Sequence, residues 1–178
     1  ADAAAALAPV SSGKAMPADE VDELVALVDQ LDDDPARQVT VGCWAAHQLT
    51  LAGRDHEAVE VIGVAELRAA SVGSPRMRGL ATGIRYQACT GVAIDPADAD
   101  AALVDLGSLV ELTEDPSARS VWALSLISAA VRDGTAADLD EALAVLDGAI
   151  AISPRPDLPW MRAAGEVTKA LMVGELDA

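Results

Sequence analysis

The chain has 178 residues, of which 52% are hydrophobic and 2% aromatic, and its 12 basic and 29 acidic side chains give a net charge of −17. This charge argues against a nucleic-acid-binding protein, because neutralising phosphates requires clustered Lys and Arg. It also repels anionic membranes, and no apolar stretch reaches the roughly 20 residues that span a bilayer.

The residue types predict an all-α fold. Phe is absent, so Ala, Leu, Val and Ile must build the core. A sandwich or barrel would instead show aromatic and β-branched strands between turn clusters. Cys43 and Cys89 are too few for a disulfide framework in a chain of this length. We therefore expect a protein of the reducing cytoplasm.

The composition divides the chain into two parts. Residues 1–17 are predicted to be an N-terminal Ala-rich segment or linker, and residues 18–178 a helical repeat domain. The first residue is Ala rather than Met, so we expect a processed chain or a module of a longer protein with flanking domains. A mature secreted terminus would look similar, but no leader remains to support it.

Four prolines recur at a nearly constant spacing through the second part. Pro35, Pro75, Pro116 and Pro156 are 40, 41 and 40 residues apart, and the first three follow Asp or Ser. A capping residue before Pro is a helix-start signal, since Pro lacks only a donor that the helix end leaves free. The spacing therefore predicts four regularly placed helices, as in helical repeat proteins.

Each interval between prolines holds two predicted helices. Apolar residues follow the 3.6-residue period of a helix over residues 21–31, 58–67, 102–110 and 142–150. The partner helices, which start near the prolines, are predicted over residues 36–52, 76–92, 117–132 and 158–172. This pattern predicts an α-solenoid of about four stacked antiparallel helix pairs.

The segment 134–154 resembles the second helix of a tetratricopeptide repeat. The family pattern has a small residue, a large apolar residue four positions on, a small residue three further, and Pro after the helix. Ala142, Leu146, Ala149 and Pro154 supply these residue types. The sequence Asp-Leu-Asp-Glu-Ala within this segment is also similar to degenerate repeat arrays in large actinobacterial proteins. Such arrays often lie beside caspase-like peptidase domains or signalling ATPases.

The resemblance covers most of residues 34–173, but unevenly. Ala58, Ile62 and Ala65 repeat the series without the closing Pro, and the match is weakest over residues 94–112, where Leu109 replaces a small residue. In the first helix of each pair the resemblance implies a small residue at a close crossing, where two helix axes approach to about 8 Å. The residues assigned to these crossings are Ala46, Gly83, Ala123 and Gly165.

A tetratricopeptide-like superhelix implies a concave wall made by the first helix of each pair. The residues placed on this wall are mildly polar to apolar, which suits an extended peptide or a partner helix. For each of them, burial between neighbouring pairs is the alternative. The implied binding residues are Thr40, Cys43, His47, Leu80, Ile84, Gln87, Ser120, Leu124 and Ile127.

Candidate metal and catalytic groups are few. Cys43 and His47 lie four residues apart, a spacing that two metal ligands could share, but a zinc site needs four donors. No third group orients a Cys–His nucleophile. Asp32, Asp33 and Asp34 are similar to the magnesium-binding clusters of terpene cyclases, but those need an aromatic cavity, and here the run caps the helix at Pro35. No catalytic residue, metal or cofactor is predicted.

The arginines and aromatic residues receive structural interpretations. The main basic concentration is expected to balance neighbouring acidic side chains, with recognition of a carboxylate-bearing peptide as the alternative; its members are Arg68, Arg76, Arg78 and Arg85. The aromatic side chains are expected to fill gaps between helix pairs; these are Trp44, Tyr86, Trp122 and Trp160.

The sequence thus predicts a non-catalytic scaffold that binds a protein segment or peptide and belongs to a larger regulatory protein. The alternative is a helical-repeat sensor of a small molecule or signal peptide, in a transcription regulator or signalling ATPase. A closed pocket between units, with several convergent polar groups, would favour the sensor.

Overall fold

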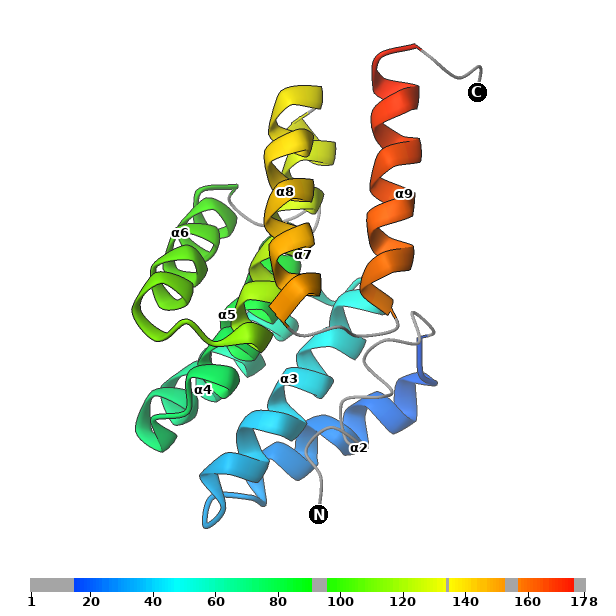
Figure 1. Ribbon diagram of the computed structural model, residues 1–178. Coiled ribbons are helices and arrows are strands. Elements are labelled where there is room, and N and C mark those ends of the chain that lie inside the picture. The colour runs from blue at the N-terminus through cyan, green and yellow to red at the C-terminus, as the bar shows by residue number, and fades with distance from the viewer. Residues whose placement is uncertain (1–14, 91–95, 134, 153–156, 175–178) are drawn as a thin grey trace.

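The computed structural model describes residues 15–90, 96–133, 135–152 and 157–174, and within them the regular secondary structure is entirely helical (Figure 1). The prediction of an all-α protein is confirmed. The helices are α2 (Ala18–Asp29), α3 (Pro35–Leu51), α4 (Asp55–Val72), α5 (Pro75–Cys89), α6 (Pro96–Thr113), α7 (Pro116–Asp133), α8 (Ala136–Ile152) and α9 (Asp157–Met172).

Three of the predicted helix starts are confirmed. Helices α3, α5 and α7 begin at their prolines. The side chains of Asp34, Ser74 and Asp115 each accept a hydrogen bond from the backbone N–H three residues on, at 3.1, 3.4 and 2.8 Å. Pro156 lies outside the described residues, and α9 begins at the next position. The cap interpretation of Asp34 is therefore correct.

We expect Asp34→Ala to lower the free energy of unfolding by about 1 kcal/mol, because the first turn of α3 loses its capping acceptor. Asp33→Ala is the matched control, because it removes the same charge from the adjacent, exposed residue. Its effect on the free energy of unfolding should stay within about 0.5 kcal/mol. Urea denaturation of both variants measures the difference. Equal losses would show that general charge, and not the cap, stabilises this helix end.

The helices contact one another in a recurring order. Helix α3 packs against α4 and α5, and α5 packs against α6 and α7, so α3 and α5 each touch both the following helix and the next helix but one. Helix α4 also packs against α5, and α6 against α7. At the two ends of the described chain, α2 packs on α3 and α9 packs on α8 (Figure 1).

The apolar faces of α4, α6 and α8 are buried at matching positions. The small-large-small series lies at Ala58, Ile62 and Ala65 in α4, and each of its counterparts in the other two helices is at most 4% exposed. Leu109, which replaces a small residue in α6, is also buried. The three helices therefore use the same side to cover the core. The counterparts are Ala102, Leu106, Leu109, Ala142, Leu146 and Ala149.

Glycines mark close helix crossings. A Cβ atom added at Gly83 would overlap Cγ1 of Val121 on α7, and one added at Gly165 would lie 2.7 Å from Cδ2 of Leu143 on α8. At both of these predicted positions a side chain of the neighbouring helix occupies the space that a Cβ atom would take. A third crossing, missed by the sequence reasoning, is at Gly79, where an added Cβ would lie 2.8 Å from Cβ of Ala118 on α7.

The aromatic residues divide into buried and exposed members. Tyr86 is 1% exposed, and the ring of Trp122 lies against Gly107 of α6, so both fill space between helices as expected. Trp44 is half-buried. Trp160 is 70% exposed, so its prediction as a gap filler is wrong. The reason is that Trp160 lies on the side of α9 that does not face α8.

Candidate functional site

Two predicted binding residues meet across α3 and α5. His47 and Gln87 are each the thirteenth residue of their helix. Nδ1 of His47 lies 3.3 Å from Oε1 of Gln87. An amide oxygen can only accept, so the imidazole N–H donates in this bond. The structure thus joins equivalent positions, 40 residues apart in the sequence, by a polar contact at the surface.

Three other predicted binding residues are covered by neighbouring helices. Cys43, Ile84 and Ser120 are 0%, 4% and 0% exposed. Cys43 and Ile84 belong to one apolar cluster between α3, α4 and α5. The Ser120 hydroxyl donates to the backbone oxygen of Pro116 at 3.0 Å. These side chains therefore form packing contacts and do not line an open surface, which corrects their assignment to the wall.

The remaining predicted residues keep partial access to solvent. Thr40 donates its hydroxyl to the backbone oxygen of Ala36 at 3.1 Å, and Leu80 packs against the cluster that contains Cys43. Leu124 and Ile127 pack against a second cluster between α7, α8 and α9. All four are half-buried, and Gln87 is exposed. We call the accessible set the α3–α5–α7 face; it comprises Thr40, His47, Leu80, Gln87, Leu124 and Ile127.

The two thiols are poorly suited to chemistry. Burial raises the pKa of Cys43, and the charge of Glu66 raises it further. Burial also raises the pKa of Cys89. A thiolate is the form that attacks electrophiles and binds metals, and a raised pKa disfavours it at neutral pH. Among the described residues, no three His, Cys, Asp or Glu side chains are grouped so that they could hold a metal ion.

An ion-pair cluster joins α4, α5 and α6. The sequence predicted its arginine but not the acidic partners. The Arg85 guanidinium lies 3.4 Å from a carboxylate oxygen of Glu66 and 2.6 Å from one of Asp105. Arg68 similarly pairs with Asp32 at 3.0 Å. For these two arginines the predicted balance of neighbouring acids is confirmed. Their partners were not foreseeable, because α4, α5 and α6 come together only in the folded chain.

Burial dominates the titration of Glu66. It raises the pKa of this carboxyl group, while the charge of Arg85 and a hydrogen bond from the Thr82 hydroxyl act in the opposite direction. The nearby carboxylate of Asp105 raises the pKa again. The folded state therefore holds this proton at pH values where an ordinary, solvated Glu has released it.

This shift predicts a pH dependence of stability. The folded chain binds the Glu66 proton more tightly than the unfolded chain, so the group favours folding less as pH rises from the ordinary Glu pKa through the raised one. The difference in unfolding free energy between wild type and Glu66→Gln should fall across that mildly acidic window. Urea denaturation at several pH values tests this, and a difference that grows with pH would contradict it.

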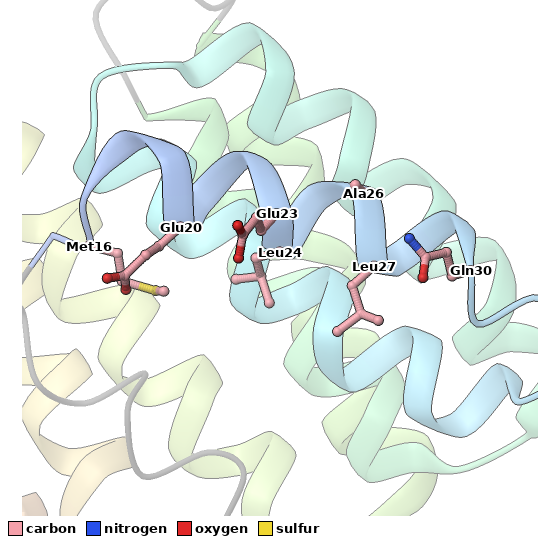
Figure 2. A pocket seen from close by; sticks show the side chains of 7 residues that line it. All are labelled: Met16, Glu20, Glu23, Leu24, Ala26, Leu27 and Gln30. Carbon is pink, nitrogen blue, oxygen red and sulfur yellow. The ribbon is translucent and has the colours of Figure 1, made fainter.

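A shallow hollow lies on the outer side of α2. Figure 2 shows the side chains that line it, with Glu20 and Glu23 beside the apolar Leu24 and Leu27. Met16, just before the helix, anchors this end by donating its backbone N–H to Oε1 of Gln48 at 2.8 Å. The hollow is lined by α2 together with Met16 before it and Gln30 after it, so it is not the closed pocket between units that a sensor requires. Its full lining is Met16, Glu20, Glu23, Leu24, Ala26, Leu27 and Gln30.

None of the helices in the described part of the chain is both long enough and apolar enough to cross a membrane. The chain matches no protein-family model, and comparison with curated proteins and with solved structures found no similar protein.

Proposed function

We propose that the chain is a tetratricopeptide-like α-solenoid that binds a protein segment and performs no catalysis. The observation that carries the proposal is the repeated packing order. The contacts of α3 with α4 and α5 recur as contacts of α5 with α6 and α7. Translational repetition of this kind is the property that defines a solenoid.

Equivalent residues support the same reading. The small-large-small positions of α4, α6 and α8 are buried in all three helices. His47 and Gln87 occupy the same position of α3 and α5 and touch each other. Side chains that stack at one repeat distance form a continuous surface, which is how solenoids contact extended ligands.

The chemistry of the α3–α5–α7 face suits a peptide backbone. Gln87 can donate and accept hydrogen bonds, and the His47 ring next to it adds a second polar group. Leu80 and Leu124 offer half-buried apolar contact. The net charge of −17 favours an uncharged or basic segment over an acidic one. We place the protein in the cytoplasm, where its two buried cysteines remain free thiols.

Selection from a displayed library of random peptides tests the proposal. We expect the wild-type chain to enrich peptides that bind His47→Ala/Gln87→Ala about 5- to 30-fold more weakly, the loss of one or two hydrogen bonds. Leu112→Ala is the control, because Leu112 is 83% exposed on α6, away from this face. Failure to enrich any peptide, or equal binding by the double variant, would contradict the proposal.

A further inference from the structure

Helix α9 exposes an apolar stripe on one side. Trp160, Val167 and Leu171 are 70%, 54% and 44% exposed, and Ala164 between them is also exposed. Residues spaced four, three and four apart lie on one face of a helix. These four residues form what we call the α9 stripe.

The opposite side of α9 is the side that packs on α8. Gly165 is buried there against Leu143. Arg162 pairs with Asp147 of α8 at 2.9 Å, and Lys169 pairs with Asp140 at 2.6 Å. The cationic groups of the helix are therefore engaged with α8, and the stripe points away from it.

The same positions are covered in α3 and α7. Counted from the helix starts, Ala164, Val167 and Leu171 correspond to buried residues of α3 and to buried or half-buried residues of α7. In α3 the backbone approaches Ala65 of α4, and in α7 the cover comes from apolar residues of α8. A following helix thus closes this side in each case. The corresponding residues are Gly42, Ala45 and Leu49 in α3 and Ala123, Leu126 and Ala130 in α7.

The stripe is complementary to itself. Its spacing is that of alternating d and a positions in a coiled-coil heptad, so two such helices can interlock. In an antiparallel pair centred between Ala164 and Val167, each Trp160 faces Leu171 of the second copy, and each Ala164 faces Val167. Small side chains then meet larger ones, as close packing requires.

Charge favours the same contact. Between Trp160 and Leu171 the residues that flank the stripe are uncharged: Met161 and Thr168 on one side, and Ala163 and Ala170 on the other. In a chain of net charge −17, most surfaces of two copies repel each other. A neutral apolar face as wide as this one lets two copies approach without placing like charges together.

We propose that two copies of this chain associate through an antiparallel pair of α9 helices, each stripe covering the other. Helix α9 of the second copy then covers the stripe, as α4 covers the corresponding side of α3 and α8 that of α7. Symmetric pairing of one patch with itself closes a dimer. The proposal does not depend on peptide binding by the α3–α5–α7 face, which lies on other helices.

Sedimentation equilibrium of the whole chain tests the dimer. A single helix pair is a small interface, so we expect a dimer dissociation constant on the order of 10–100 µM. Val167→Glu should weaken dimerisation at least about tenfold, because it places two charges in the contact. Val167 is exposed, so the thermal unfolding curve should not change when it is recorded well below that dissociation constant, where both chains are monomers. Leu112→Glu, which places the same charge at an exposed position on α6, is the matched control and should dimerise as wild type does.

Salt provides a second readout. Raising NaCl from about 0.05 to 0.5 M should tighten the dimer, because it screens the repulsion between two acidic chains. A mass of one chain at all concentrations up to about 500 µM would overturn the proposal. So would a dimer that Val167→Glu leaves intact or that salt dissociates. A monomer that binds a peptide of residues 136–152 at the stripe would show that a helix like α8, and not a second α9, covers this face, and would also overturn it.

Discussion

Gly79→Ala is expected to destabilise the chain by about 1–2 kcal/mol. The added Cβ would lie 2.8 Å from Cβ and 3.0 Å from Cα of Ala118, so α5 and α7 must move apart. Overpacking of this kind costs about 1–3 kcal/mol, which exceeds the roughly 0.5–1 kcal/mol that Ala gains over Gly inside a helix. Urea denaturation followed by circular dichroism measures the change.

Gly63→Ala is the matched control for this crossing. Gly63 lies inside α4. Apart from the adjoining backbone of α4, no heavy atom would lie within 4 Å of a Cβ added there. The helix-propensity gain then stands alone, and we expect a stabilisation of about 0.5–1 kcal/mol. The two Gly→Ala substitutions should therefore have opposite signs. A Gly79→Ala variant as stable as wild type would show that α5 and α7 do not meet closely at this point.

Leu146→Ala is expected to have the largest effect, a loss of about 2–5 kcal/mol, because it leaves a cavity that helices can close only in part. Leu146 is 0% exposed and shares an apolar cluster with Ala123 of α7 and Leu158 of α9. Leu112→Ala removes the same atoms from a position that is 83% exposed and should change stability by less than about 0.5 kcal/mol.

The same variant tests the proposed solenoid. In a solenoid each unit contacts only its neighbours, so damage at one end spreads weakly to the other. Hydrogen exchange should show faster opening of α7, α8 and α9 in Leu146→Ala, while the amides of α3 keep their protection. Equal loss of protection in α3 and α8 would indicate one cooperative bundle and would contradict the repeat architecture that the proposed function assumes.

The proposed peptide-binding face and the proposed dimer would use different helices of one scaffold. The α3–α5–α7 face contains the His47–Gln87 contact, whereas the α9 stripe lies at the end of the described chain. Dimerisation would present two copies of the face to a partner, and two linked sites bind a bivalent partner more tightly than one. The variants Gln87→Ala and Val167→Glu separate the two activities.

Local signals in the sequence determined the helix starts and the buried side of each helix. Asp34, Ser74 and Asp115 specify helix starts because a cap acts on an N–H only three residues away. The apolar period of α4 and α8 likewise follows from neighbouring residues on the same helix, and most of the residues it selects are buried, although Leu67 in α4 is 75% exposed. Such features need no knowledge of the distant chain.

Which surfaces are covered depends on how the helices pack against one another. Cys43 and Ser120 are buried and Trp160 is exposed, although each has a sequence neighbourhood that fits the opposite assignment. Arg85 joins acids from α4 and α6, which no local pattern predicts. A helix has several sides, and the side that is buried is the one against which other helices pack. Those helices come from distant parts of the chain, so the sequence around a residue does not show whether it is covered.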